Sequence, residues 1–470
     1  ARAAGVVRRG LSYSLRGGGQ GVSRMRIVKG AGEARAKILR RTPLETSLPR
    51  SIRDDIARIF GADLGAQEVV DRILDDVRAN GDAAVLKYNR EIDRMSEGTT
   101  LEVTPDEVQA ACDEVDDGLV TALKQAAERV RTFHERQLAH SMRSFKEDGL
   151  GQIVRPLQRV GLYAPGTSAV YPSTILMTAV PARTAGVKEV VMVTPVQSDG
   201  RVSPLKLVAA KLAGVDRIFK AGGVQGIGAM AYGTDSVPRV HKVCGPGNVF
   251  VTLAKKKVYG EVGIDGVFGP SETLVIADGS AAPPLVAADM LAGAEHDELA
   301  TVVLLTDSSQ LADVVAQRFQ DGLRYVDRRD VAAKSIEARG GVAVVSSIGE
   351  AVELASEYAP EHLCLHVADP EVLLSNVRNA GCVFVGAMSV ESIGDYTAGP
   401  SHVMPTGGSA AFASPLGVHD FLKATSVVQM DVETAQAVGP AGAMIARAEG
   451  FTGHARAIEA RMSGRASGDA

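Results

Sequence analysis

The chain of 470 residues contains no tryptophan, and aromatic residues make up only 4% of it. Proteins that bind single-stranded nucleic acid use aromatic side chains as stacking platforms, so this composition argues against such a ligand. Lys and Arg number 51 against 56 Asp and Glu, which gives a net charge of −5 and no basic field. We therefore expect no nucleic-acid partner.

Cysteine pairs and long apolar runs are also missing. The chain's four cysteines show no CxxC spacing, which excludes a zinc knuckle and a dithiol redox motif, and dispersed thiols fit a reducing compartment. No apolar run approaches the roughly 18 residues that span a bilayer, so no membrane association is expected. Hydrophobic residues make up 45% and charged residues 23%, a balance typical of a soluble protein long enough for two or more domains.

The first 24 residues contain five arginines, no acidic residue and a glycine-rich run at 17–21. An organellar transit peptide is one interpretation. The other is a disordered or upstream-translated extension with Met25 as the true start. The glycine run favours this second interpretation because glycines disrupt an amphipathic helix. The predicted compartment is the cytoplasm, or an organelle if the segment is a transit peptide.

Helical patterns dominate up to about residue 140. The apolar residues of 66–80 form one helical stripe, and Gly81 is a suitable stop. Thr104 is a predicted N-cap, with Pro105 at the first helical position. A long charged helix is predicted to run from there to about His140.

From about residue 158 the chain alternates between apolar, β-branched strands, turns and helices. This alternation predicts a mostly parallel α/β sheet, and its restart after residue 270 predicts two incomplete doubly wound (Rossmann-like) domains. The predicted strands are 159–163, 189–193, 217–220, 240–243, 273–277, 301–306, 341–346, 362–367 and 381–386.

The glycine-rich turn at 222–228 is compatible with nucleotide binding. Its glycines, however, lack the G-x-G-x-x-G spacing, and no acidic residue lies clearly about 20 residues after the turn. A dinucleotide site and a simple tight turn between strand and helix both stay open.

Residues 394–408 are too rich in Gly and Pro for a helix or a central strand, and are predicted to form a long, functional loop. The loop carries Asp395 and His402, residue types that bind metals and move protons. Ser271 and several other polar residues make sense as groups that converge on this loop.

Three further histidines each have a carboxylate nearby in sequence: His296, His362 next to Glu361, and His454 after Glu449. Histidine with a carboxylate is the ligand set of catalytic zinc and also the usual acid/base set. For each one, a surface or hydrogen-bonded core histidine stays the alternative. That second interpretation is adopted for the other five, His134, His140, His241, His366 and His419. Cys244 is interpreted as a small buried residue rather than a nucleophile.

Six segments, in order over nearly all of residues 60–460, resemble the histidinol dehydrogenase family. They are 161–166, 244–248, 269–278, 294–296, 359–363 and 394–408. The resemblance implies a zinc- and NAD-dependent four-electron oxidation of L-histidinol, through L-histidinaldehyde, to L-histidine.

The resemblance also implies a role for each matching residue and a homodimer of intertwined chains. Glu361 and His362 would be the acid/base pair, and His296, Asp395 and His454 would bind zinc. The NAD contacts would be Tyr163, Gln225 and Asn248. Substrate would be held by Ser271, His296, His362, Asp395, His402, Glu449 and His454, of which Glu449 and His454 would enter the partner's site.

The predicted division has five parts. Residues 1–24 are the extension and 25–59 an N-terminal arm. Residues 60–160 with 271–412 form a first α/β domain that holds the metal and catalytic residues. Residues 161–270 form a second α/β domain with the NAD contacts, and 413–470 a C-terminal dimerisation tail.

Gly293 departs from the family, which has a zinc-binding glutamine there, three residues before the histidine of its Ala-Glu-His motif. Positions three apart share a helix face, but glycine offers no oxygen, and Glu295 points about 100° away from His296. We therefore expect weakened zinc binding, which Gly293→Gln would strengthen. Two alternatives stay open: a related NAD dehydrogenase for another small polar alcohol, and a metal-depleted inactive homologue.

Overall fold

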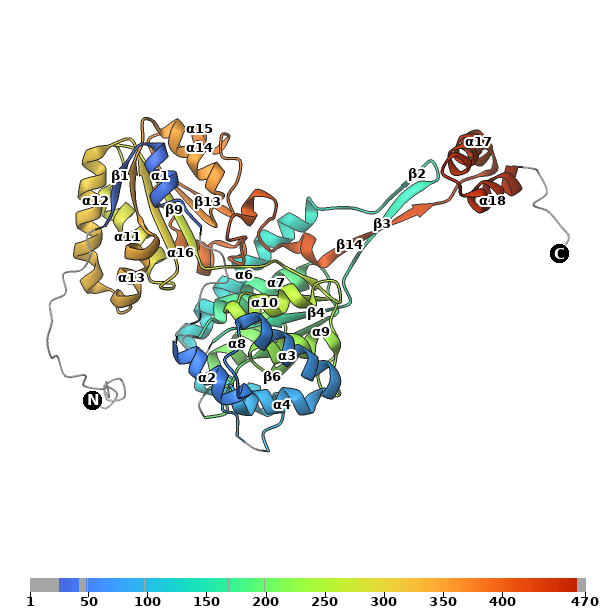
Figure 1. The fold of residues 1–470 in the computed structure, drawn as a ribbon, viewed down its shortest axis with the longest axis horizontal. Coiled ribbons are helices and arrows are strands. Elements are labelled where there is room, and N and C mark those ends of the chain that lie inside the picture. Colours follow the sequence, from blue (N-terminus) through green and yellow to red (C-terminus); the bar gives the residue numbers. More distant parts are fainter. Residues whose placement is uncertain are drawn as a thin grey trace.

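The computed structural model describes residues 25–41, 48, 50–96, 98–166, 170–197 and 199–462. Two α/β bodies lie next to each other, and a long antiparallel ribbon leads away from them to a pair of helices (Figure 1). Each body is built on a wholly parallel sheet, so the predicted fold class is confirmed.

The five-stranded body has the strand order β6-β5-β4-β7-β8, with every neighbouring pair parallel. The order reverses between β4 and β7, as in a doubly wound fold. Its strands are β4 (Arg159–Tyr163), β5 (Glu189–Thr194), β6 (Arg217–Lys220), β7 (Lys242–Cys244) and β8 (Gly263–Ile264). Its helices are α2 (Arg50–Phe60), α3 (Ala66–Asn80), α4 (Asp82–Glu91), α5 (Pro105–Glu114), α6 (Asp117–Ala139), α7 (Pro172–Thr184), α8 (Pro204–Ala213), α9 (Gly223–Tyr232) and α10 (Val249–Val258).

The six-stranded body has the order β1-β11-β10-β9-β12-β13, again wholly parallel, and reverses between β9 and β12. Its strands are β1 (Ile27–Lys29), β9 (Glu272–Ala277), β10 (Thr301–Thr306), β11 (Gly341–Val344), β12 (His362–His366) and β13 (Cys382–Val385). Its helices are α1 (Ala31–Lys37), α11 (Pro283–Ala294), α12 (Ser309–Gly322), α13 (Arg329–Arg339), α14 (Ile348–Tyr358), α15 (Pro370–Leu374) and α16 (Glu391–Ile393).

The apolar, β-branched runs form the central strands because helices cover both faces of each sheet. Every residue of β9 and of β10 is buried, as is every residue of β5 after Glu189. Strands buried on both faces need continuous apolar sequence rather than alternation, which is why these strands were predicted within a few residues of their ends.

The packing of the first helices does not follow the predicted domain boundary. Residues 60–160 were assigned to a domain with 271–412, yet Val70 of α3 shares a core with Phe219 of β6. Likewise, Val130 of α6 shares a core with strand β4 of the five-stranded body. The amphipathic stripe of a helix indicates that one face of the helix is buried, but it does not indicate which sheet covers that face.

The predicted N-terminal arm, residues 25–59, is also divided between the two bodies. β1 pairs in parallel with β11 and forms an edge of the six-stranded sheet. Ile56 of α2 belongs to the core of the five-stranded body. Both elements are therefore integral to the bodies.

A third sheet, an antiparallel ribbon with the order β14-β3-β2, was not predicted from the sequence. It consists of β2 (Phe145–Glu147), β3 (Leu150–Pro156) and β14 (Leu422–Val428), and it joins the bodies to α17 (Val432–Ala448) and α18 (Thr452–Met462). These two helices pack on each other around Ala443, Ala446 and Ala455, in a small core of their own. The ribbon carries them far from both bodies (Figure 1).

No helix in the described ranges combines the length and apolar character that crossing a membrane requires. Both interpretations of residues 1–24 concern a segment that lies outside the described residues.

Candidate active site

Polar side chains gather at the amino-terminal edge of the six-stranded sheet. Ser271 directly precedes β9, Glu361 directly precedes β12, and His362 is the first residue of β12. His296 lies in the connection from α11 to β10. Parallel strands begin at the same edge of a sheet, so these segments, distant in sequence, meet there.

Glu361 is held by two hydrogen bonds. Its Oε2 accepts one from Ser271 Oγ at 2.6 Å and one from the backbone N–H of Glu272 at 3.1 Å. Burial raises the pKa of Glu361 to about 7, against the lowering effect of His362 and of these hydrogen bonds. A carboxyl group that titrates near neutral pH is suited to accept and return a proton.

Glu361 and His362 are consecutive, yet their side chains meet, with His362 Nδ1 3.6 Å from Glu361 Oε2. Consecutive residues within a strand point to opposite faces, but Glu361 lies just outside β12. Ala359 has a φ of 51°, in the left-handed region, and Pro360 follows it. This bend at the strand start is the condition under which both side chains can face one site.

His362 is buried among carboxylates. Its Nδ1 lies 3.6 Å from Glu391 Oε1, and its Nε2 lies 3.6 Å from Asp395 Oδ1. Burial disfavours the charged imidazolium, but Glu391, Glu361 and Asp395 outweigh burial and raise the pKa of His362 to about 10. The protonation state of this ring therefore depends on the charge that these carboxylates carry.

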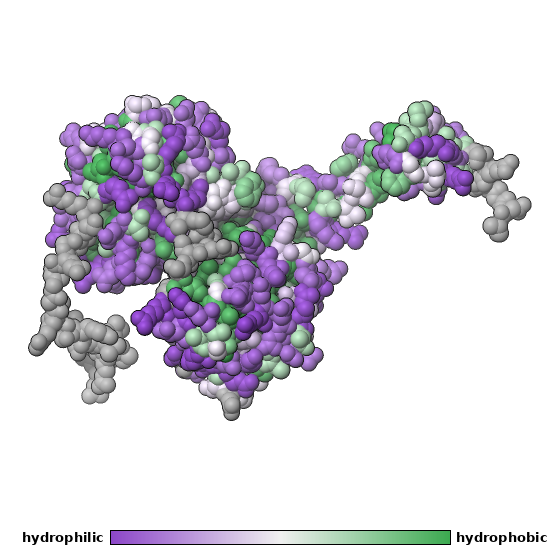
Figure 2. All heavy atoms as spheres, viewed as in Figure 1, coloured by the Kyte–Doolittle hydropathy of each residue, from purple (hydrophilic) through white to green (hydrophobic). Residues whose placement is uncertain are grey.

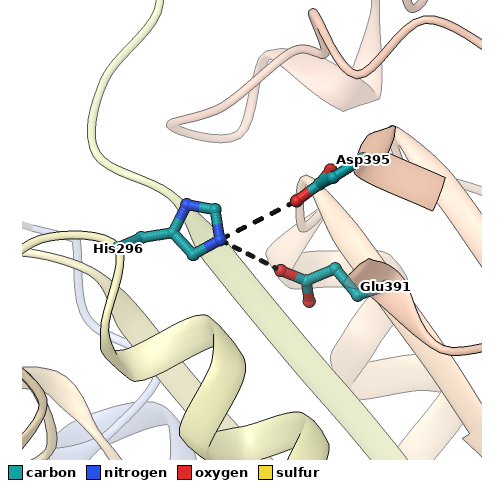
Figure 3. Close-up of side chains that lie close together, drawn as sticks. All are labelled: His296, Glu391 and Asp395. Atoms are coloured by element: carbon teal, nitrogen blue, oxygen red, sulfur yellow. Dashed lines mark ion pairs between the residues drawn. The ribbon is translucent and has the colours of Figure 1, made fainter. Parts of the chain in front are cut away.

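His296, Glu391 and Asp395 converge on one point (Figure 3). His296 Nε2 lies 4.0 Å from Glu391 Oε1 and 3.8 Å from Asp395 Oδ2. Zinc binds nitrogen and oxygen at about 2.0–2.2 Å, so two ligand atoms of one ion can stand up to roughly 4.4 Å apart. Both distances fall within that limit, so each carboxylate can share a metal ion with His296.

Residues 394–408 were predicted to form an irregular loop, but the structure begins them with a π-helical turn over Gly394–Ala398, directly after α16. Such turns occur often at functional sites. Glu391 and Asp395 lie four positions apart and so share one helical face. Glu391 was not predicted as a site residue, because it lies just before the predicted loop and no helix was expected there.

His402 connects the two bodies. Its Nδ1 donates to the backbone carbonyl of Asp395 at 2.8 Å, and its Nε2 lies 3.2 Å from the hydroxyl of Thr174 in α7. Burial lowers the pKa of His402, which favours the neutral ring. The segment after the π-helical turn is thereby fixed against the five-stranded body.

The structure does not bring Glu449 and His454 to this site within one chain. Glu449 caps the end of α17, and the ring of His454 in α18 stacks on Phe451 with 5.1 Å between centroids. Both belong to the helical tail, which the ribbon places far from the six-stranded sheet (Figure 1).

The residues expected to contact NAD lie along the carboxyl-terminal edge of the five-stranded sheet. Tyr163 ends β4, Gln225 follows β6, and Asn248 follows β7 and caps α10. The strand order reverses between β4 and β7, and doubly wound folds bind ligands outside that reversal. Gln225 is wholly buried, and its amide donates to Asn89 and Asp93, each at 3.1 Å.

Cys244 is wholly buried, and burial raises the pKa of its thiol. A thiol that resists ionisation is a poor nucleophile. The interpretation of Cys244 as a small buried residue is therefore confirmed.

A family model for histidinol dehydrogenase matches residues 61–462. The chain belongs to the histidinol dehydrogenase family. The histidinol dehydrogenase of Deinococcus radiodurans is 49% identical over 93% of this chain and 100% of its own length. That of Dehalococcoides mccartyi strain CBDB1 is 45% identical with the same coverage. The crystal structure of histidinol dehydrogenase from Elizabethkingia anophelis matches with a TM-score of 0.85 at 32% identity, covering 94% of this chain and 99% of that one. The chain is therefore an oxidoreductase of this family.

Gly293 lies against Thr273, so a side chain at position 293 would collide with Thr273. A Cβ added to Gly293 would stand 2.5 Å from Thr273 Oγ1 and 3.0 Å from Thr273 Cβ. Thr273 is itself buried and branched at Cβ, so it cannot swing away as a long side chain would. The expectation that Gly293→Gln would strengthen zinc binding therefore conflicts with the packing.

Gly293→Ala is predicted to destabilise the protein by roughly 1–3 kcal/mol, as overpacking of a core does, although alanine favours a helix. Chemical denaturation measures this change. Gly32→Ala is the matched control, because Gly32 also lies in a helix but an added Cβ there meets nothing within 4 Å. If both variants gain stability, Thr273 does not fill the space beside Gly293.

Proposed function

We infer that the chain oxidises L-histidinol, through L-histidinaldehyde, to L-histidine, the last steps of histidine biosynthesis. NAD is the electron acceptor and zinc the resident metal. The observation that carries this proposal is the pairing of Glu361, whose pKa is about 7, with His362 at the edge of a cluster of metal-binding side chains. One site thereby offers two proton acceptors, as two successive oxidations need.

The proposed metal ligands of the chain itself include His296 and Asp395, with an imidazole nitrogen and a carboxylate oxygen, both ordinary zinc donors. When bound, zinc would supply a positive charge that holds the amine and imidazole of the substrate and offsets the surrounding carboxylates.

His362 is proposed as the base of the first oxidation. It takes the proton of the alcohol while a hydride leaves the same carbon for NAD, so the products are aldehyde, NADH and a proton on His362. The ring must be neutral to do this, and it is the nearby carboxylates that favour its charged form. Neutralising those carboxylates is therefore a requirement of the step.

Glu361 is proposed as the base of the second oxidation. The aldehyde must first add water to become a gem-diol, and Glu361 takes a proton from that water. A second hydride then leaves the diol carbon for another NAD, which gives the carboxylic acid. Ser271 holds Glu361 in place through its 2.6 Å hydrogen bond.

NAD is proposed to lie along the carboxyl-terminal edge of the five-stranded sheet, beside Tyr163 and Asn248. The strand reversal there supports this placement. Gln225 would support the site from beneath rather than touch the cofactor, because its side chain is wholly buried.

A homodimer is proposed because the helical tail is far from the site of its own chain and leaves apolar side chains uncovered. Val432, Met444 and Ile445 are each more than half exposed. Apolar surface on the tail is also visible in Figure 2. Covering this surface with a second chain would bring Glu449 and His454 to the partner's site, the former for substrate and the latter for zinc.

The cytoplasm is the proposed compartment. The relatives named above are bacterial and give no support to an organellar transit peptide in residues 1–24. The four cysteines, all within the described ranges, are free, which fits a reducing environment.

Formation of NADH from L-histidinol, measured after chelator treatment with and without added zinc, tests the proposed function. Two NADH per histidinol that depend on zinc are expected. Other small polar alcohols serve as competing substrates, and faster oxidation of one of them would identify a related dehydrogenase instead. No NADH from any of them at saturating zinc would indicate an inactive homologue.

Glu361→Gln is predicted to slow the oxidation of L-histidinaldehyde roughly 10²–10⁴-fold and the oxidation of L-histidinol much less, because only the aldehyde must be hydrated. Single-turnover kinetics with each substrate separate the two steps. Glu357→Gln is the control, since Glu357 is an exposed carboxylate that pairs with Arg35 at 2.8 Å. Equal slowing of both steps would reject this division of labour.

Mixing a His454→Ala chain with a His362→Ala chain is predicted to restore activity. Each mixed dimer then has one intact site, so random exchange of subunits gives up to roughly a quarter of wild-type activity. Each variant alone should stay inactive. If subunits demonstrably exchange and no activity returns, His454 serves its own chain.

A further inference from the structure

One carboxylate oxygen in the candidate site has no hydrogen-bond partner among the described residues. Glu391 is only 1% exposed, and its Oε2 accepts a hydrogen bond from Thr273 Oγ1 at 2.8 Å. Its Oε1 is buried and has no hydrogen-bond partner, and the nearest ring nitrogens lie 3.6 Å away on His362 and 4.0 Å away on His296. A buried acceptor without a hydrogen-bond donor is unfavourable, so this oxygen is suited to a positive group in the space that it faces.

The unpaired oxygen faces the metal-binding side chains. Glu391 Oε1 is the atom that lies 4.0 Å from His296 Nε2, and Asp395 Oδ2 lies 3.8 Å from the same nitrogen on the same side of the ring (Figure 3). The three ligand atoms lie within 4.8 Å of one another. Glu391 thus presents its free oxygen to the space where His296 and Asp395 would share an ion.

Thr273 and Gly293 explain why a carboxylate can serve here. The Thr273 hydroxyl occupies the space in which a side chain at position 293 would begin, 2.5 Å from an added Cβ. The same hydroxyl donates to Glu391 and fixes its orientation. The residue that excludes an amide ligand at 293 is therefore the residue that holds Glu391.

The geometry points to Glu391 as a direct ligand of the bound zinc, a carboxylate in place of the amide that Gly293 cannot provide. Together with His296 and Asp395 it gives one chain three ligands and two negative charges at the ion. Three protein ligands suffice for catalytic zinc. This inference rests on the proposed function, because it assumes zinc to be the resident metal.

A competing role for Glu391 is to position His362, since His362 Nδ1 lies 3.6 Å from the same oxygen. The two roles predict different measurements. A ligand determines how tightly zinc binds, whereas a residue that only orients His362 affects the proton-transfer step and leaves zinc binding nearly unchanged.

Zinc affinity, measured on the full-length protein by competition with a chromogenic chelator, separates these roles. Glu391→Ala should weaken zinc binding more than 100-fold, beyond the roughly 10–100-fold that loss of an outer-shell partner costs. Thr273→Val keeps the shape but removes the hydroxyl that orients Glu391, so it should fall within that smaller range. Asp289→Asn is the control, because Asp289 is also a buried carboxylate but pairs with His366 at 2.8 Å. Its zinc affinity should match that of the wild type.

Glu391→Gln provides a second test if the alanine variant does not fold, since it keeps the shape of the side chain. The visible spectrum of the cobalt(II)-substituted protein should change, because a neutral amide replaces a carboxylate in the coordination sphere. An unchanged cobalt spectrum, or a loss of zinc affinity of 100-fold or less in Glu391→Ala, would overturn the assignment.

Failure of this inference can be distinguished from failure of the proposed function. If the wild type makes zinc-dependent NADH from L-histidinol while Glu391→Ala retains its zinc, only the ligand assignment is wrong. If the wild type makes no NADH but Glu391→Ala loses zinc, the metal site stands and the proposed substrate is wrong.

Discussion

Crowding of negative charge around the buried ring of His362 is the constraint on which the site depends. Glu361, Glu391 and Asp395 all approach this ring, and water cannot screen them because they are buried. Burial raises the pKa of Glu361 and that of Glu391 to about 7, while these carboxylates raise the pKa of His362. Such a cluster is held together only by positive charge, either a proton shared among its members or a cation, which is why it is suited to moving protons beside a metal.

The two sheets divide the work between opposite edges. The proposed acid/base pair and the proposed metal ligands lie at the amino-terminal edge of the six-stranded sheet, whereas the proposed NAD contacts lie at the carboxyl-terminal edge of the five-stranded one. His402 and Thr174 connect the segment after the π-helical turn to α7 and so couple the two edges. The helical tail, which includes Glu449 and His454, lies far from both bodies within a single chain.

Local sequence gave most of the fold because its signals were strong. β4, β6 and β10 have the bounds that were predicted for them, and Thr104 caps α5 as predicted. Glu391 was not predicted as a site residue, because the local sequence signal near it was misleading. Glycine and proline nearby argued for a loop, but the first residues of that segment form a π-helical turn, which tertiary packing stabilises against their low helix propensity.

The sequence by itself determined the α/β class, the positions of most central strands of the two parallel sheets and, through family motifs, the candidate residues of the site. Only the tertiary structure decided which sheet the helices of residues 60–160 cover, that Thr273 fills the space beside Gly293, and that Glu391 joins His296 and Asp395. The physical reason is that periodicity and capping are interactions between residues a few positions apart, which a sequence displays directly. Three other features depend on segments that meet only in the folded chain. They are the sheet that covers the buried face of a helix, the space beside a glycine, and the carboxylate oxygen that has no hydrogen-bond donor.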